Sequence, residues 1–213
     1  MRRWYNWAVW IALVAESAWI LIGLLYRHYS IGATTYPIFI VAVFTVLALT
    51  YRRTRWTPAF VRLLLALEFL GSVGDRFGWF GGPGTTGVSW GSFERFVGYT
   101  LQVNSFLPDS LGFPLAILAT IAESVLGLAL LIGLRIKLAS RLSALLLLLF
   151  GTAMSISLPL DQPFGYAVFV LAAGAALLSH SDASVVSVDA AIKKSGKNRA
   201  PEKADTFNTS QMN

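Results

Sequence analysis

The feature that most constrains this chain is a series of six apolar segments, most of them long enough to cross a lipid bilayer. A transmembrane helix needs about 20 mostly apolar residues to cross a hydrocarbon core about 30 Å thick. Hydrophobic residues make up 55% of the chain and charged residues 13%, and the mean hydropathy of +0.62 lies in the membrane range. We therefore predict an all-α integral membrane protein with six transmembrane helices, at Trp4–Tyr26, Ile31–Tyr51, Pro58–Gly74, Ser110–Leu134, Leu138–Leu158 and Gly165–Ser179.

The first apolar segment also has to be compared with a secretory signal peptide. It is long for the apolar part of such a peptide, and the sequence YRHYS that follows it has no small-x-small cleavage pattern. We predict a retained helix.

The distribution of basic residues predicts the orientation of the spans. Short cytoplasmic loops collect lysine and arginine, and an even number of spans puts both termini on one side. With both termini in the cytoplasm, all but three of the 17 lysines and arginines are cytoplasmic, and the three exceptions are Arg27, Arg76 and Arg95. We expect a multi-pass protein of a cytoplasmic (inner) membrane, with the glycine-rich loop 74–109 on the exoplasmic side.

The composition also excludes several classes of function. The chain has no cysteine, which removes disulfides, thiol redox pairs and cysteine-ligated iron–sulfur clusters. Its two histidines, His28 and His180, are predicted on opposite membrane faces, so they cannot be paired ligands of a haem. They cannot supply a Ser–His–Asp triad, and no HExxH motif occurs. The net charge of +6 follows the ends of the spans, so we predict no nucleic-acid partner.

Three glutamates lie inside predicted spans: Glu16, Glu68 and Glu123. A charge at the bilayer centre costs about 2.5–3.5 kcal/mol on insertion scales, so each glutamate needs a buried partner or a proton. Each is followed along its helical face by a glycine, and small faces let helices approach, so we expect all three acids to converge in the bundle interior. A protonated or paired glutamate in an interhelical hydrogen bond is the structural alternative to a functional acid.

Asp75 and Arg76 end the third predicted span and begin the exoplasmic loop. One interpretation is a salt bridge between them that fixes the helix end. The other is the mouth of a cavity that holds Glu68 and hydrogen-bonds a polar headgroup or small anion.

The loop beyond them, FGWFGGPGTTG at residues 77–87, lacks the ending of a phosphate-binding loop. We expect Trp79 and Trp90 to anchor it at the membrane interface, and a lid is the alternative. The following segment, Ser92–Asn104, predicts a helix with one apolar face, either lying in the interface or packed on the bundle.

Residues 62–179 resemble the DoxX family of small membrane proteins. The resemblance rests on RLLLALEFLGSVGDRFGWFG, FERFVGYTLQVNSFLP, ATIAESVLGLALLIGLRIKLAS and the last two spans. It implies a DoxX-like four-helix membrane domain at 58–180 preceded by two extra helices at 1–57. Residues 181–213 are polar, lack hydrophobic periodicity and carry mixed charge, so their composition predicts a largely disordered cytoplasmic tail. Glu123 matches the family's second-helix glutamate, and Asp75 matches the acidic position that ends its first helix.

Some DoxX relatives are subunits of a thiosulfate:quinone oxidoreductase, and others belong to membrane complexes linked to oxidative stress or thiols. This chain departs from the thiol-linked members because it has no cysteine. We expect a membrane subunit or accessory factor of a redox system, linked to quinone from a partner complex through Glu68, Asp75, Arg76 and Glu123. The alternatives are a small-solute or proton-coupled transporter and a membrane anchor. Expected partners are the lipid bilayer, a soluble or membrane oxidoreductase subunit and a second copy of the chain.

Overall fold

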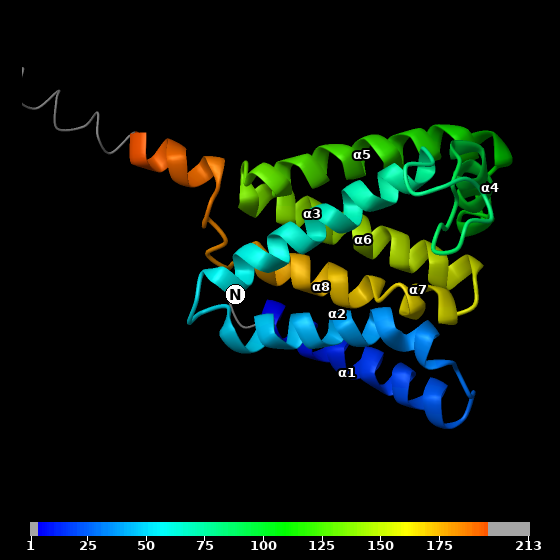
Figure 1. The fold of residues 1–213 in the computed structure, drawn as a ribbon, viewed down its shortest axis with the longest axis horizontal. Helices are drawn as coiled ribbons and strands as arrows, with labels where there is room; N and C mark the ends of the chain where they lie inside the picture. The colour runs from blue at the N-terminus through cyan, green and yellow to red at the C-terminus, as the bar shows by residue number, and fades with distance from the viewer. Residues whose placement is uncertain (1–3, 196–213) are drawn as a thin grey trace, which may run out of the picture.

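The computed structural model describes residues 4–195, and every regular element within them is a helix. Figure 1 shows the long helices side by side, with a smaller helix, α4, across one end. The elements are α1 (Trp4–Leu25), α2 (Ile31–Thr50), α3 (Trp56–Arg76), α4 (Phe93–Val103), the short 3₁₀ helix η1 (Asp109–Leu111), α5 (Gly112–Ile132), α6 (Ile136–Ser157), α7 (Asp161–Gly165) and α8 (Val168–Leu178).

Five helices have the length and composition to cross a membrane, namely α1, α2, α3, α5 and α6. The sixth predicted span, Gly165–Ser179, instead contains the last residue of α7, a turn and the short helix α8, because Ala167 adopts the left-handed conformation between the two helices. The 11 residues of α8 cover about 16 Å at 1.5 Å per residue, roughly half of a hydrocarbon core. The all-helical architecture is confirmed, and its five long apolar helices are compatible with a helical membrane protein. The count of six spans stays a prediction.

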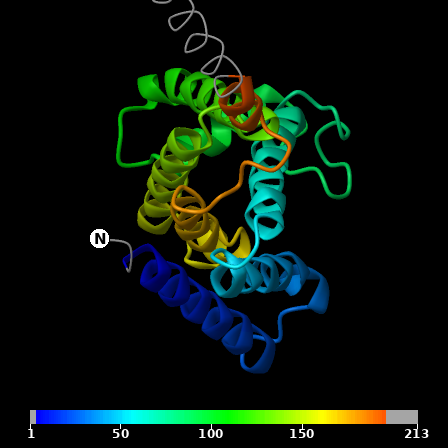
Figure 2. The same cartoon turned by 90° about the vertical axis from the view of Figure 1, so that its left-hand side faces the viewer.

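Four helices form a ring, in which α3 packs on α5, α5 on α6, α6 on α8 and α8 on α3. Figure 2 shows this ring viewed along its axis, with α1 and α2 outside it. Both outer helices pack on α8, which explains why α8 is apolar around its whole circumference and mostly buried. Gly127 brings α5 close to α3, since a Cβ there would meet Leu70.

The two ends of the bundle differ in composition. The start of α1 and the end of α8 lie at one end, together with the α2–α3 and α5–α6 turns that carry Arg52, Arg53, Arg55 and Arg135 (Figure 1). The loop 77–92, α4 and α7 lie at the other end. Both ends of the described chain thus lie at the same end of the bundle. The assignment of this end to the cytoplasm stays a prediction.

The first part of the predicted disordered tail is ordered against the bundle. Residues 188–195 are helical, and Asp189 accepts hydrogen bonds from the backbone N–H groups of Arg135 and Ile136 at the start of α6. Arg62 Nη2 donates to the carbonyl oxygens of Val185 and Val186. Residues 181–190 therefore form a strap over the α5–α6 turn, and the exposed residues 191–195 extend away from the bundle (Figure 1). The rest of the predicted tail, 196–213, lies outside the described residues.

Candidate functional site

A buried ion pair joins the end of α3 to the middle of α5. Arg76 Nη2 donates to both carboxylate oxygens of Glu123, at 2.6 and 2.7 Å, and the two side chains are only 2% and 3% exposed. Arg76 also donates to Thr120 Oγ1 at 2.9 Å and to Ser72 Oγ at 3.0 Å. A charge-assisted contact of this kind satisfies both ions where water is excluded.

The helical period explains how the polar partners come together. Ser72 precedes Arg76 by one turn of α3, and Thr120 precedes Glu123 by one turn of α5, so each pair shares a helical face. Because α3 and α5 pack closely, the two polar faces meet. The sequence places Ser72 and Thr120 on the small faces beside Glu68 and Glu123, but it did not identify them as partners of Arg76, although their one-turn spacing from Arg76 and Glu123 was a usable signal.

Asp75 does not form the predicted salt bridge with Arg76. Consecutive residues on a helix point in different directions, and Asp75 turns toward the loop, where its Oδ2 accepts the backbone N–H groups of Ser89 and Trp90 at 3.1 and 2.9 Å. Asp75 thus fixes the returning arm of the glycine-rich loop on the end of α3. The predicted salt bridge between Asp75 and Arg76 is therefore wrong. The carboxylate that pairs with Arg76 is that of Glu123.

Aromatic rings cover the outer side of the ion pair. The guanidinium carbon of Arg76 lies 3.7 Å from the centre of the Phe96 ring and 5.5 Å from that of Trp90, which is cation–π range. Trp90 also contacts Phe96 edge-on, so it packs inward instead of anchoring the loop at the interface as predicted. Helix α4 buries Phe96, Thr100 and Val103, and it packs on α5 and α6.

A cavity of about 1000 Å³ extends from this ion pair into the ring of helices, and we call it the main cavity. Its polar lining includes Glu68, Asp75, Arg76 and Glu123, so four of the five predicted site residues are brought together. Most of the remaining lining is apolar and comes from α3, α4, α5, α6 and α8. Tyr36 of α2 reaches the same cavity and lies within interaction range of Glu68.

Glu16 is the predicted site residue that does not join this group. It is completely buried in α1, and its two carboxylate oxygens have no hydrogen-bond partner among the described residues. It does not line the main cavity, because α1 lies outside the ring and packs on α2 and α8. The expected convergence of three glutamates is therefore found for Glu68 and Glu123, and Glu16 lies apart from them.

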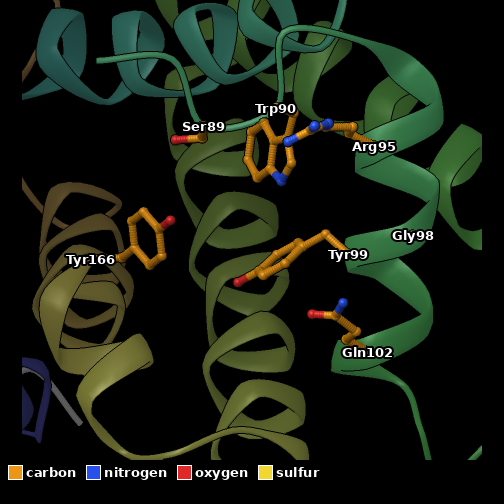
Figure 3. A pocket seen from close by; sticks show the side chains of 7 residues that line it. All are labelled: Ser89, Trp90, Arg95, Gly98, Tyr99, Gln102 and Tyr166. Carbon is orange, nitrogen blue, oxygen red and sulfur yellow. The ribbon is translucent and has the colours of Figure 1, made fainter. Parts of the chain in front are cut away.

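A second, smaller pocket of about 410 Å³ lies at the loop end between α4 and Tyr166, and we call it the vestibule. Figure 3 shows Tyr99 and Gln102 projecting from α4 toward Tyr166, with Trp90 and Ser89 above them. Four residues line both the vestibule and the main cavity, namely Ser89, Trp90, Tyr99 and Tyr166. The vestibule therefore adjoins the main cavity at the loop end, and Arg95 is the one charged residue among its described lining.

The polar end of the main cavity retains unused hydrogen-bonding capacity. Arg76 Nε and Asp75 Oδ1 are buried and have no partner among the described residues. One is a donor and the other an acceptor, and both belong to residues that line the cavity. No cluster of three metal-binding side chains occurs within residues 4–195. The arrangement is suited to binding an organic molecule with a polar group and an apolar body.

Comparison with protein-family models, with curated proteins and with solved structures finds no match to this chain. The resemblance to the DoxX family therefore stays a prediction that rests on the motifs quoted above.

Proposed function

We propose that this protein binds a quinone in the main cavity and acts as a membrane subunit or accessory factor of a redox system. The observation that carries the proposal is a large, mostly apolar cavity with a buried arginine, an aspartate and two glutamates at its polar lining. Its volume of about 1000 Å³ is at the upper end of the roughly 300–1,000 Å³ typical of small-molecule sites. The DoxX resemblance supports the same class of ligand.

The polar residues match what a quinone headgroup requires. Its carbonyl oxygens accept hydrogen bonds, and the reduced form donates them from hydroxyl groups. The unused donor at Arg76 and acceptor at Asp75 provide both kinds of partner. Reduction of a quinone takes two electrons and two protons, so the electrons have to come from a partner oxidoreductase. Glu68 is a carboxyl group placed to hold a proton, while Glu123 stays paired with Arg76.

A tryptophan quenching experiment tests the proposal. Gly71 lines the main cavity, and a Cβ there would meet no atom within 4 Å. Gly71→Leu should therefore fill part of the cavity without forcing its walls apart. Gly32→Leu is the matched control, because Gly32 also lies in a helix with room for a side chain but does not line the cavity.

The protein would be placed in phosphatidylcholine nanodiscs and titrated with duroquinone, a tail-less benzoquinone that quenches indole fluorescence. We expect saturable quenching in the wild type and in Gly32→Leu, and at least tenfold weaker binding in Gly71→Leu, a loss of about 1.4 kcal/mol. Quenching that rises linearly in all three proteins, as free diffusion in the bilayer would produce, would overturn the proposal.

Proton-coupled transport is the second candidate, favoured by the presence of Glu68, Tyr36 and Glu123 in a cavity that adjoins the vestibule at the loop end. It would be supported by solute flux into proteoliposomes that is lost in Glu123→Gln. A wild type that binds duroquinone and shows no flux would leave the redox function as the better account.

A further inference from the structure

The main cavity also reaches the lateral surface of the bundle, between α5 and α6. Four of its lining residues on these helices are exposed: Leu118, Leu149, Thr152 and Ile156. The cavity-lining residues of α2 and α3 are all buried or half-buried. Among the described helices of membrane-crossing length, the side opening of the cavity is therefore confined to the α5–α6 face, and we call it the lateral portal.

The lateral portal and the vestibule differ in chemistry. The portal is lined by three aliphatic side chains and one threonine, whose hydroxyl already donates to the carbonyl of Leu148. The vestibule carries an arginine, a glutamine, a serine and two tyrosines. Because both helices of the portal are long enough to cross a membrane, its exposed side chains face lipid tails, whereas the vestibule lies at the loop end (Figures 1 and 3).

We propose that the natural ligand carries a long apolar tail, and that this tail passes through the lateral portal into the bilayer while the headgroup stays beside Arg76 and Asp75. This inference rests on the proposed binding function and adds the class of molecule: a lipid-soluble quinone with a hydrocarbon chain, loaded from the membrane. An apolar chain at the vestibule would have to displace water from polar groups, which is unfavourable. At the portal it meets only apolar side chains and a hydroxyl that is already bonded.

The lateral portal is continuous with the main cavity. Each portal residue lines the same cavity that Arg76 and Glu123 line, so one molecule can contact both. Small side chains, Ala119, Ala122 and Ala153, also line the cavity on these two helices and leave room between them.

Photolabelling tests the position of the tail. A fully substituted benzoquinone with a ten-carbon chain and a diazirine near the chain end would be bound to the wild type in phosphatidylcholine nanodiscs, irradiated, and mapped by peptide mass spectrometry. The controls lie on the same helices: Leu145 is 54% exposed and Leu149 58% exposed, yet only Leu149 lines the cavity. Ile121 of α5 is the matched control for Leu118, because both side chains are exposed and only Leu118 lines the cavity.

We expect label on Leu118, Leu149, Thr152 and Ile156 that an excess of unlabelled tailed quinone removes, with Ile121 and Leu145 at background. Equal label on Ile121 and Leu145 would show a tail dissolved in bulk lipid, and label on Gln102 or Tyr166 would show a tail in the vestibule. Either result, or a portal covered by a second copy of the chain, would overturn the inference.

A pair of substitutions gives a second measurement. Leu149→Trp should narrow the portal and weaken binding of the tailed quinone severalfold more than it weakens binding of tail-less duroquinone. Leu145→Trp should change neither. If duroquinone itself fails to bind the wild type, the proposed function fails; if duroquinone binds and Leu149→Trp leaves the tailed quinone unaffected, only the portal is wrong.

Discussion

Helix α3 carries two buried arginines about four turns apart, and their surroundings are opposite in kind. Arg76 and Arg62 are 2% and 1% exposed. Arg76 is neutralised by a carboxylate on a neighbouring helix and lines the main cavity. Among the described residues, the hydrogen bonds of Arg62 go to two backbone carbonyls of the strap, at 3.4 and 3.1 Å, and Arg62 does not line that cavity. Equal burial therefore accompanies an ion pair beside the main cavity at one end and the fastening of the strap at the other.

The setting of Arg62 shows how tightly the strap end is assembled. Gly133 ends α5 in the left-handed conformation, and a Cβ at this position would collide with Arg62 Nη1. The carbonyl of Gly133 accepts the backbone N–H of Asp189 in the strap. The α5–α6 turn, the strap and Arg62 thus form one unit that closes the basic end of the bundle.

Removing the carboxylate of Arg76 should produce the largest effect. Glu123→Leu leaves a buried guanidinium without a counterion, which costs about 3–5 kcal/mol of unfolding free energy. Titration with SDS in mixed micelles would measure the loss. Arg76→Leu combined with Glu123→Leu should recover most of it, because an apolar pair has no charge to desolvate. A double variant as unstable as Glu123→Leu alone would show that the ion pair is not the reason for the loss.

Arg62→Leu should cost less, because no carboxylate is left unpaired. The carbonyls of Val185 and Val186 would lose their charged donor, a loss of about 1.5–3 kcal/mol for hydrogen bonds to a charged group. The strap should loosen, so trypsin should cleave after Lys193 and Lys194 faster than in the wild type. If Arg62→Leu proved as destabilising as Glu123→Leu and tryptic cleavage did not change, the conclusion that Arg62 mainly holds the strap would be wrong.

The cap supplied by the strap gives a smaller effect. Asp189 satisfies two N–H groups at the start of α6 from a distant part of the sequence. Asp189→Ala should cost about 0.5–2 kcal/mol, as other helix caps do. Asp189→Asn is the matched control, since its amide oxygen can still accept one of the two bonds. If Asp189→Ala leaves both stability and tryptic cleavage unchanged, the strap is not held by this cap.

The sequence predicts the helical elements well because long apolar runs have few alternatives in a membrane. It also places Glu68 and Glu123 on small faces, and both line the main cavity. It could not assign the partner of Arg76, since adjacency in sequence suggested Asp75 while packing of α3 on α5 selected Glu123. It also missed the strap, whose contacts at Arg62 and Asp189 are polar and join residues more than 50 positions apart.

A third arginine, Arg27, forms an exposed ion pair, and breaking this pair should reduce the unfolding free energy least. Arg27 and Asp161 join the α1–α2 turn to α7, with side chains 53% and 42% exposed. The hydrogen bond from the Trp19 indole, and then the charge of Arg27, hold the pKa of Asp161 below its usual value. A depressed carboxyl pKa adds stability above the pKa of the unfolded chain, about 3.9, and that stability is lost as the pH falls through the folded pKa.

Asp161→Asn removes this dependence while retaining an oxygen that can accept the bond from Trp19. Unfolding free energies of the wild type and Asp161→Asn should differ most at pH 7 and converge below about pH 4. Because solvent screens the exposed pair, the difference at pH 7 should be smaller than that produced by Asp189→Ala. If Asp161→Asn lowered the unfolding free energy at pH 7 as much as Glu123→Leu does, burial would not be what sets the strength of these ion pairs.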